Sequence, residues 1–258
     1  MHINLNHHQY LQYFSGKLPL DSISFIFKHI NHSFNRETLK FIEDNWQNEV
    51  IKNPNIYNGK LYDIVDINVN KDNTINIFYD IIDYKTSIAT KKKEYKELNN
   101  SYFSNHLSIA GILKTADNKI LIGSDLTFKN NLQSWKFPGG YFDAEKDKTI
   151  MDCLIRECKE EIGNYTFLNS NIINISKNIK HNFTSIICLC NLEETSKELI
   201  KYNAENKANI IDSDEMQIIR FIDFKKEKIK KVLNCELISL SPTTVLGLNE
   251  VANGIDIY

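Results

Sequence analysis

The sequence predicts an α/β fold, in which helices pack against a central β-sheet. The stretch NFTSIICLC at 182–190 is apolar on both faces, as expected of a strand in the middle of a sheet. The stretch at 149–162 has helical periodicity instead, with an apolar arc formed by Met151, Leu154, Ile155, Cys158 and Ile162. The residue pattern changes near residues 96–105, from a polar and basic stretch to one typical of strands. We therefore expect an N-terminal α+β accessory region at 1–102 and a second domain at 103–258.

Composition narrows the class of protein. The 258 residues carry a formal net charge of -2, which gives no global field to attract nucleic acid or an anionic membrane. No segment approaches the 18 or so apolar residues of a membrane-spanning helix, and the N-terminus lacks the pattern of a signal peptide. The five cysteines include no Cys-x2-Cys pair. We expect a reduced cytoplasmic protein with no membrane partner, for which nucleic acid is an unlikely partner and the oligomeric state is open.

The N-terminal region is predicted to begin with helix and continue with a hairpin. Residues 8–50 are expected to be mainly helical, with Asn35 as N-cap of the stretch RETLKFIEDNWQNEV. A turn at Asn58-Gly59 precedes two alternating segments that predict a β-hairpin over 61–82. The polar and basic stretch that follows predicts a short helix or a loop.

The second domain is predicted to alternate strands and helices. Strands are expected at 106–115, 120–123, 182–190 and 216–224. Gly163 is expected to end the 149–162 helix in a left-handed conformation. Two closing helices are expected near the C-terminus, the second with Ser241 as its N-cap and Pro242 at its first position.

Three glutamates share one face of the 149–162 helix. Glu157, Glu160 and Glu161 are three and four residues apart or adjacent, so they are neighbours that repel one another by a few tenths of a kcal/mol per pair. Clustered carboxylates form a hard, oxygen-rich site that suits Mg²⁺ or Mn²⁺. A solvated acidic helix face is the alternative, and the flanking residues decide against it: Arg156 comes directly before the cluster, and Gly139-Gly140 lie upstream.

These residues resemble the signature of a known family. RECKEEIG at 156–163 is similar to the Nudix hydrolase pattern Arg-Glu-apolar-x-Glu-Glu-x-Gly at every fixed position, and WKFPGG at 135–140 is similar to the stretch that precedes it. The resemblance extends over residues 105 to about 235. It implies an α/β/α sandwich with a mixed sheet, the signature helix on one side and the C-terminal helix on the other.

The resemblance also implies an activity and a set of site residues. The reaction is metal-dependent hydrolysis of a nucleoside diphosphate linked to another moiety, with Mg²⁺ or Mn²⁺ as cofactor. The metal ligands are the Gly139 carbonyl, Glu157, Glu160 and Glu161, and the two last glutamates are also catalytic. A further catalytic glutamate is expected at Glu215, with Asp212 and Asp214 as competitors. Trp135 is expected to form wall or core, or to stack on a base. Structural roles fall to Gly140, Arg156 and Gly163.

One stretch departs from the family. The loop YFDAEKDK at 141–148 is two residues longer than the family pattern, and Lys148 stands where the family has a glutamate that braces the arginine. Asp143, Glu145 or Asp147 could replace it, and Glu145 is the residue we favour.

A second resemblance concerns the accessory region. The stretches NPNIYNGKLYDIVDINV and INIFYDIIDYKTSIAT resemble the region before the Nudix domain in UDP-glucose/UDP-galactose pyrophosphatases, although Ser87 replaces a usual aromatic and Ala89 a usual glycine. This implies that Asp83, Tyr84 and Lys85 lie near a substrate of the nucleotide-sugar type; a surface loop is the alternative. Other open functions are mRNA-cap, ADP-ribose or dinucleotide hydrolysis, or a non-catalytic Nudix module that binds a nucleotide. The basic stretches 91–93 and 225–231 favour RNA or phosphate binding only weakly, because charge runs are usually solvated faces.

Overall fold

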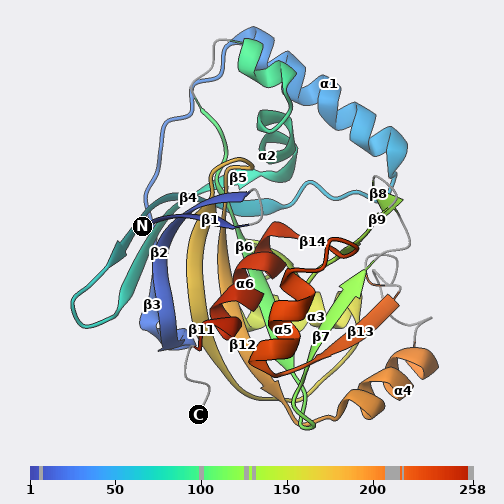
Figure 1. The fold of residues 1–258 in the computed structure, drawn as a ribbon. Coiled ribbons are helices and arrows are strands. Elements are labelled where there is room, and N and C mark those ends of the chain that lie inside the picture. Colours follow the sequence, from blue (N-terminus) through green and yellow to red (C-terminus); the bar gives the residue numbers. More distant parts are fainter. Residues whose placement is uncertain are drawn as a thin grey trace.

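The computed structural model describes residues 1–5, 8–98, 102–124, 128–129, 132–206, 216 and 218–254. Most of its strands belong to one mixed sheet (Figure 1). Its main path runs in the order β1 (His2–Leu5), β2 (His8–Pro19), β11 (Phe167–Asn178), β12 (Phe183–Leu192), β6 (His106–Lys114), β4 (Lys60–Val69), β5 (Ile75–Asp83) and β3 (Ile23–Phe27). The β12–β6 and β3–β5 pairs are parallel and the other pairs of this path are antiparallel.

Shorter strands extend this sheet beside β6. Strand β10 (Gly139–Tyr141) pairs with β6, and β13 (Ile218–Asp223) pairs with β7 (Lys119–Ser124), which itself joins the end of β6. A separate small sheet contains β8 (Phe128–Lys129), β9 (Leu132–Trp135) and β14 (Ser239–Leu240). This arrangement brings β10, which carries the Gly-Gly pair, next to the centre of the main sheet.

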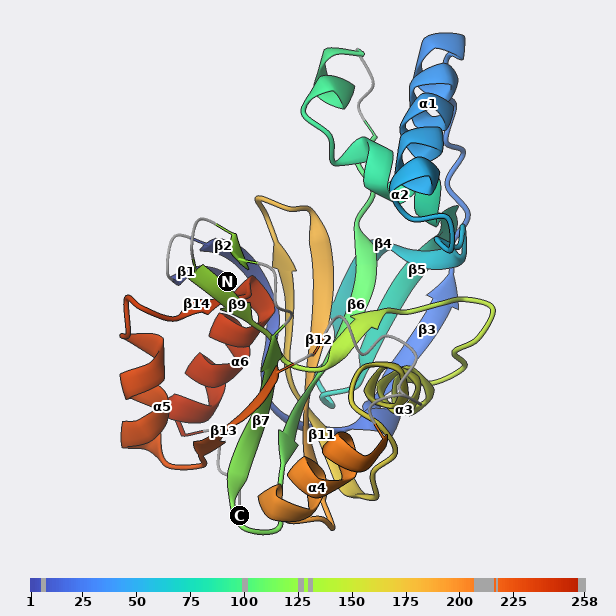
Figure 2. The same ribbon diagram turned by 90° about the vertical axis from the view of Figure 1, so that its right-hand side faces the viewer.

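Helices cover both faces of the sheet. Figure 2 shows α3 (Ile150–Glu161) on one side and α5 (Lys226–Leu233) and α6 (Pro242–Ala252) on the other. The alternation along β6 explains this: Leu107, Ile109 and Leu113 pack in the cluster that contains the apolar residues of α3, whereas Ala110 and Ile112 pack in the cluster under α6. The α/β/α sandwich expected from the sequence is therefore confirmed.

The N-terminal segment corrects one prediction. Residues 8–19 and 23–27 are strands rather than helix. Within the predicted span, α1 (Arg36–Lys52) is the α-helix, and η1 (Leu20–Ser22) is a single 3-10 turn. Strand β2 pairs with β11 along most of its length and buries Tyr10 and Leu18. Strand formation here is determined by this distant partner rather than by local propensity. The N-cap prediction holds, since the Asn35 side chain accepts from the Thr38 amide at 2.8 Å.

The predicted hairpin is present as β4 and β5, and two short helices follow it. Asp83 caps α2 (Tyr84–Thr90) by accepting from the Thr86 amide, and η2 (Glu94–Glu97) comes next. Together with α1 these helices lie above one end of the sheet (Figures 1 and 2). The strands of the accessory region and those of the second domain thus belong to the same sheet.

Helix α3 is rotated relative to its predicted orientation. Ile155, expected in the core, is 46% exposed, whereas Glu161, expected on the exposed face, is only 2% exposed. The inward stripe consists of Ile150, Cys153, Leu154 and Cys158. The helix starts with a capping box between Thr149 and Asp152. Gly163 follows it with φ +122° and donates to the Cys158 carbonyl at 2.8 Å, so a positive φ does end this segment.

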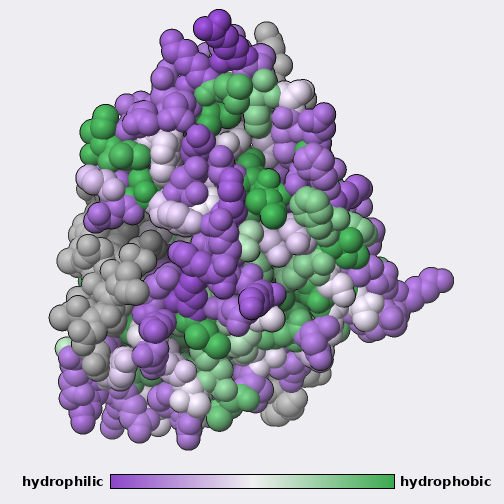
Figure 3. All heavy atoms as spheres, turned by 180° about the vertical axis from the view of Figure 1, so that it is seen from behind, coloured by the Kyte–Doolittle hydropathy of each residue, from purple (hydrophilic) through white to green (hydrophobic). Residues whose placement is uncertain are grey.

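The remaining elements include two that the sequence did not reveal. These are β11, next to the centre of the sheet, and α4 (Ser196–Asn206). Both closing helices are present, and Ser241 caps α6 as predicted, accepting from the Thr244 amide. From behind, hydrophilic residues dominate the top of the surface and a band through its middle (Figure 3). Within the described ranges, no helix combines the length and apolar character needed to cross a bilayer.

Candidate active site

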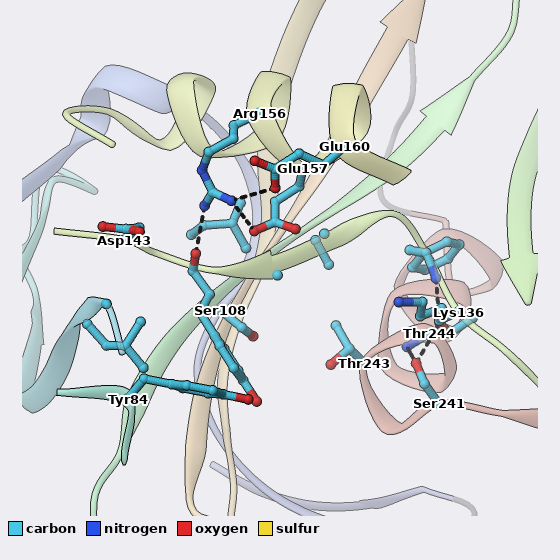
Figure 4. A pocket seen from close by; sticks show the side chains of 18 of the residues that line it. Tyr84, Ser108, Lys136, Asp143, Arg156, Glu157, Glu160, Ser241, Thr243 and Thr244 are labelled. Carbon is cyan, nitrogen blue, oxygen red and sulfur yellow. Dashed lines mark hydrogen bonds and ion pairs between the residues drawn. The ribbon is translucent and has the colours of Figure 1, made fainter. Parts of the chain in front are cut away.

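A cavity of about 560 Å³ lies where three distant segments of the chain meet (Figure 4). One wall comes from β10 and α3, including Arg156, Glu157 and Glu160. A second wall comes from the accessory region, and a third from the start of α6. The residues that the last two contribute are Tyr57, Gly59, Leu61, Tyr84, Ser241, Thr243 and Thr244. The site therefore depends on the packing of the N-terminal region, not on the signature helix alone.

Arg156 organises the acidic wall. Its Nη1 atom donates to Glu157 at 2.7 Å and to Glu160 at 3.1 Å, so one guanidinium nitrogen holds both carboxylates (Figure 4). Its Nη2 atom donates to the Tyr141 carbonyl at 2.9 Å. Burial alone would lower the pKa of Arg156, but the Asp147 and Glu157 carboxylates raise it overall. Arg156 is thus a permanent cation with a fixed position.

Asp147, not Glu145, braces Arg156. Asp147 accepts from Nε at 2.9 Å and from Nη2 at 2.7 Å, a bidentate pair whose acidic partner is almost fully buried. Glu145 instead accepts from the Tyr57 hydroxyl at 2.5 Å. A backbone hydrogen bond also joins the loop to the accessory region: the Ala144 amide donates to the Lys60 carbonyl at 2.7 Å. The extended loop therefore docks on the accessory region, which draws Glu145 away from the arginine.

Gly139 and Gly140 lie at positions where a side chain would clash, and the clashing atoms differ between the two. Gly139 has φ +145°, and a Cβ there would collide with the Ile109 carbonyl of the neighbouring strand. A Cβ on Gly140 would occupy the position of the Glu157 carboxylate. Gly139 thus permits the close pairing of β10 with β6, and Gly140 leaves room for an acidic side chain at the cavity.

Glu161 is buried beside the cavity rather than exposed on the acidic face. Its Oε1 atom accepts from Lys136 Nζ at 2.7 Å, and its Oε2 atom accepts from the Gly139 amide at 2.9 Å. The rotation of α3 places it there, next to the cavity-lining Lys136. Glu161 thereby connects the helix to the strand that carries the glycines.

The carboxylate oxygens of Glu157 and Glu160 in the acidic wall are ligands of the kind that a divalent cation prefers. Glu157 and Glu160 both line the cavity and approach the same nitrogen of Arg156, so their carboxylates lie close together. Glu161 is engaged by Lys136 and Gly139. In the part of the chain that the structure describes, no three His, Cys, Asp or Glu side chains are grouped as a metal site. The chemistry of the donors fits Mg²⁺ or Mn²⁺ at Glu157 and Glu160, whereas Glu161 would have to exchange its lysine partner.

The three expected substrate contacts lie in different places. Tyr84 lines the cavity, with its ring 5.7 Å from that of Tyr141 (Figure 4). Lys85 does not line it; its ammonium pairs with Glu43 of α1 at 3.0 Å. Trp135 is also outside the lining and packs under α6, where its carbonyl accepts from the Ser241 amide. Of these three, only Tyr84 is placed to meet a ligand.

One predicted residue cannot be located, and several lining residues were not anticipated. Glu215, with its competitors Asp212 and Asp214, lies outside the described residues. Lys136 was overlooked although it lies inside the quoted WKFPGG stretch. Thr243 and Thr244 were considered only as the beginning of a helix. Tyr57 is adjacent to the Asn58-Gly59 turn, and no local pattern indicates that this turn faces the signature helix.

Comparison with known proteins gives a match for part of the chain. Residues 104–229 match the family model described as NUDIX domain. No curated protein matches the chain. Among solved structures, a NUDIX hydrolase from Nitrosomonas europaea is 12% identical, with a TM-score of 0.42 over 58% of this chain and 90% of that one. A bifunctional NMN adenylyltransferase/ADP ribose pyrophosphatase from Francisella tularensis is 16% identical, with a TM-score of 0.37 over 60% and 44% of the two chains. NrtR from Shewanella oneidensis, solved with a 27mer DNA, is 14% identical, with a TM-score of 0.36 over 56% and 59%.

Proposed function

We propose, from the match of residues 104–229 to the NUDIX domain model, that this chain is a metal-dependent pyrophosphohydrolase. It cleaves the diphosphate of a nucleoside diphosphate linked to another moiety. Water adds to one phosphorus and the bridging P–O bond breaks, which gives a nucleoside monophosphate and the phosphate of the second moiety. Such a reaction is carried mainly by positioning and by electrostatic stabilisation of the phosphoryl oxygens.

The observation that supports this most is the composition of the cavity. Carboxylates of Glu157 and Glu160 face it from one wall, while Lys136 lines it as a cation. Tyr84 of the accessory region and Tyr141 of β10 supply aromatic rings. Its volume of about 560 Å³ lies within the usual range of small-molecule sites. A charged diphosphate with a flat base at one end suits these three kinds of group.

The chain's own residues have distinct roles in this reaction. Arg156 fixes Glu157 and Glu160 side by side, and these two, with Glu161 and the Gly139 carbonyl, would hold the divalent ion. When bound, that ion neutralises the diphosphate and lowers the pKa of a water that attacks phosphorus. Lys136 faces the cavity and can attract a phosphate oxygen, which would relieve Glu161 of its lysine partner.

A nucleotide sugar is the first substrate class to test. The accessory region, whose sequence resembles that of UDP-sugar pyrophosphatases, contributes Tyr57 and Tyr84 to the cavity wall. The hydroxyls of Ser241 and Thr243 across the cavity from Tyr84 are suitable partners for sugar hydroxyls (Figure 4). ADP-ribose is the second candidate, because it contains the same diphosphate between two sugars.

The test is a panel of substrates with and without metal. UDP-glucose, UDP-galactose, ADP-ribose, a dinucleoside polyphosphate and a capped RNA are each incubated with Mg²⁺, Mn²⁺ or a chelator, and monophosphate products are separated by chromatography. We expect turnover of a nucleotide sugar only with metal present. Turnover of capped RNA alone would replace the substrate proposal. No turnover of any compound with either ion would favour a non-catalytic nucleotide-binding module.

A further inference from the structure

A second cavity, of about 300 Å³, lies away from the signature helix. It is formed between the end of α2 with η2, residues 103–104 just before β6, and the tip of the β11–β12 hairpin, which lies beside α2 in Figure 1. The lining consists of Thr90, Lys91, Lys96, Phe103, Ser104, Ile179, Lys180, His181 and Asn182. None of these residues lines the candidate active site.

The charged side chains that line this cavity are basic. Lys91, Lys96 and Lys180 all line it, and the lining described above contains no carboxylate. His181 shows the resulting field: burial lowers its pKa, and the charges of Lys180 and Lys91 lower it further. The amino groups of these three lysines come from two segments that are far apart in the sequence. Burial lowers the pKa of Lys91 to about 7, so the ammonium groups of Lys96 and Lys180 supply most of the positive charge. Such convergence of like charges is unfavourable by itself and is relieved by an anion.

The floor and walls are ordered by specific contacts. Asn182 donates from Nδ2 to the carbonyls of Phe103 and Ser104, at 2.9 and 2.8 Å, which ties the hairpin tip to the opposite side. Thr90 and Ser104 are almost fully buried, and their hydroxyls bond to each other at 3.0 Å. Phe103 and Ile179 remain 36% and 40% exposed and form apolar sides. The cavity is thus a built pocket rather than a loose group of surface lysines.

We propose that this cavity is a second ligand site, which binds the phosphate monoester of a small molecule such as a nucleoside monophosphate. The ammonium groups of Lys96 and Lys180 bind the phosphate oxygens as point charges. Phe103 and Ile179 cover the apolar face of the rest of the ligand. The volume of about 300 Å³ lies at the lower end of the range for small-molecule sites and suits one mononucleotide rather than a strand of nucleic acid.

One buried residue lies between this site and the candidate active site. Lys91 Nζ lies 2.5 Å from Nδ1 of His106, and the His106 ring lies 4.3 Å from that of Tyr141, which lines the active-site cavity. His106 is 2% exposed. The two cavities are therefore neighbours separated by a packed side chain, and a ligand in one does not occupy the other.

Calorimetric titration of the full chain with AMP, without metal, tests the proposal. The double variant Lys96→Ala/Lys180→Ala removes two exposed cations from the site. We expect it to lose one binding event, or to weaken that event at least about tenfold, while turnover of the substrate panel stays unchanged. Lys93→Ala is the matched control, since Lys93 is an exposed lysine of the same segment that does not line the cavity. Lys180→Glu, a single reversal, should weaken the same event if the double variant folds poorly.

Titrations with inorganic phosphate and with adenosine identify the part of the ligand that is bound. Competition by phosphate would support a phosphate site, and an added gain for AMP would support contact with the nucleoside. Raised salt should weaken the event in both cases. The proposal is overturned if the double variant binds AMP like the unchanged chain, if adenosine binds as tightly as AMP, or if only an oligonucleotide binds. Because turnover is measured separately, these results do not depend on the proposed function.

Discussion

Arg156 and Asp147 form a bidentate ion pair that links the signature helix to the loop before it. The two bonds, at 2.9 and 2.7 Å, leave the Asp147 side chain 1% exposed and the Arg156 side chain 18% exposed. Asp147 also accepts from the Asp143 amide at 2.9 Å, so it closes the loop on itself. The same arginine holds Glu157 and Glu160. The conformation of the loop and the placement of both carboxylates therefore depend on one pair of residues.

Replacing Asp147 with alanine should destabilise the protein and reduce activity. Removal of one partner leaves a largely buried guanidinium without its main acceptor, which should cost about 2–4 kcal/mol. Arg156 would then be free to shift, and Glu157 and Glu160 with it. Urea unfolding measures the first effect, and turnover of the best panel substrate measures the second.

Glu145→Gln is the matched control for that variant. Glu145 belongs to the same loop and was the residue favoured by sequence, but it contacts Tyr57 and not Arg156. We expect a change below about 1 kcal/mol in stability. A larger loss from Glu145→Gln than from Asp147→Ala would contradict the assignment of the brace.

Glu157→Gln and Glu160→Gln should each abolish most activity without unfolding the chain. The amide keeps the shape but removes the charge that would hold a divalent ion, and a loss of at least about a hundredfold in kcat is expected. Glu161→Gln should differ, because Glu161 is buried and bonded to Lys136 and Gly139. That change should reduce stability as well as activity. Glu227→Gln, on the exposed face of α5, serves as the control, and full turnover by Glu160→Gln would place the site elsewhere.

Features set by neighbouring residues were predicted correctly from the sequence. The caps at Asn35 and Ser241 each depend on a side chain and an amide three residues later. The 61–82 hairpin and the α3 helix likewise follow from short-range periodicity. Gly139 and Gly140 belong to a pattern whose steric reason, close approach of Ile109 and Glu157, appears only in the structure.

Features set by distant contacts were missed. Strand β2 was read as helix because its partner β11 is more than 150 residues away in the chain. Ile155 was predicted in the core but is exposed, and Glu161 was predicted at the surface but is buried. A helical wheel gives the relative angles of side chains but not the orientation of the helix on the sheet. Asp147 could not be separated from Glu145, since the loop conformation depends on its backbone bond to Lys60.

Tyr84 should contribute to substrate binding, whereas Lys85 should not. Truncating Tyr84 to alanine removes an aromatic wall of the cavity and should raise KM about three- to tenfold, while Tyr84→Phe keeps the ring and should have little effect. Lys85→Ala breaks only a pair with Glu43 on α1 and should leave KM unchanged. Steady-state kinetics on the three variants decide this. A KM raised by Lys85→Ala but not by Tyr84→Ala would show that the ligand lies outside the cavity described above.

Asp117 should make stability depend on acid pH. Partial burial alone would raise its pKa, but bonds from Ser196 and Thr115 outweigh that effect and hold the pKa well below the ordinary 3.8. A carboxyl group whose pKa is lower in the folded than in the unfolded state stabilises the fold at pH values above its unfolded-state pKa. This contribution is lost as the pH falls through the folded-state pKa. With the side chain 32% exposed, we expect no more than about 1 kcal/mol.

Asp117→Asn measures that contribution. The difference in free energy of unfolding between this variant and the unchanged chain should be largest near neutral pH and shrink as the pH falls below about 4. Asp44→Asn, at an exposed position on α1, is the matched control. A difference that stayed constant with pH would mean that the bonds to Asp117 do not depend on its charge.

A chain that starts at residue 103 should be insoluble or inactive. Strand β2 covers β11 over the register from Tyr10 to Pro19, and β4 lies between β6 and β5, so the deletion exposes two edges of the main sheet. Bare edges with apolar faces promote association. The same deletion removes Tyr57, Gly59, Leu61 and Tyr84 from the cavity wall. A chain that lacks only residues 1–5 is the control: it loses β1, which among the described strands pairs with β2, and should remain soluble and active. Size-exclusion chromatography and turnover measure both, and a soluble, fully active 103–258 chain would show that the accessory region is not needed for the site.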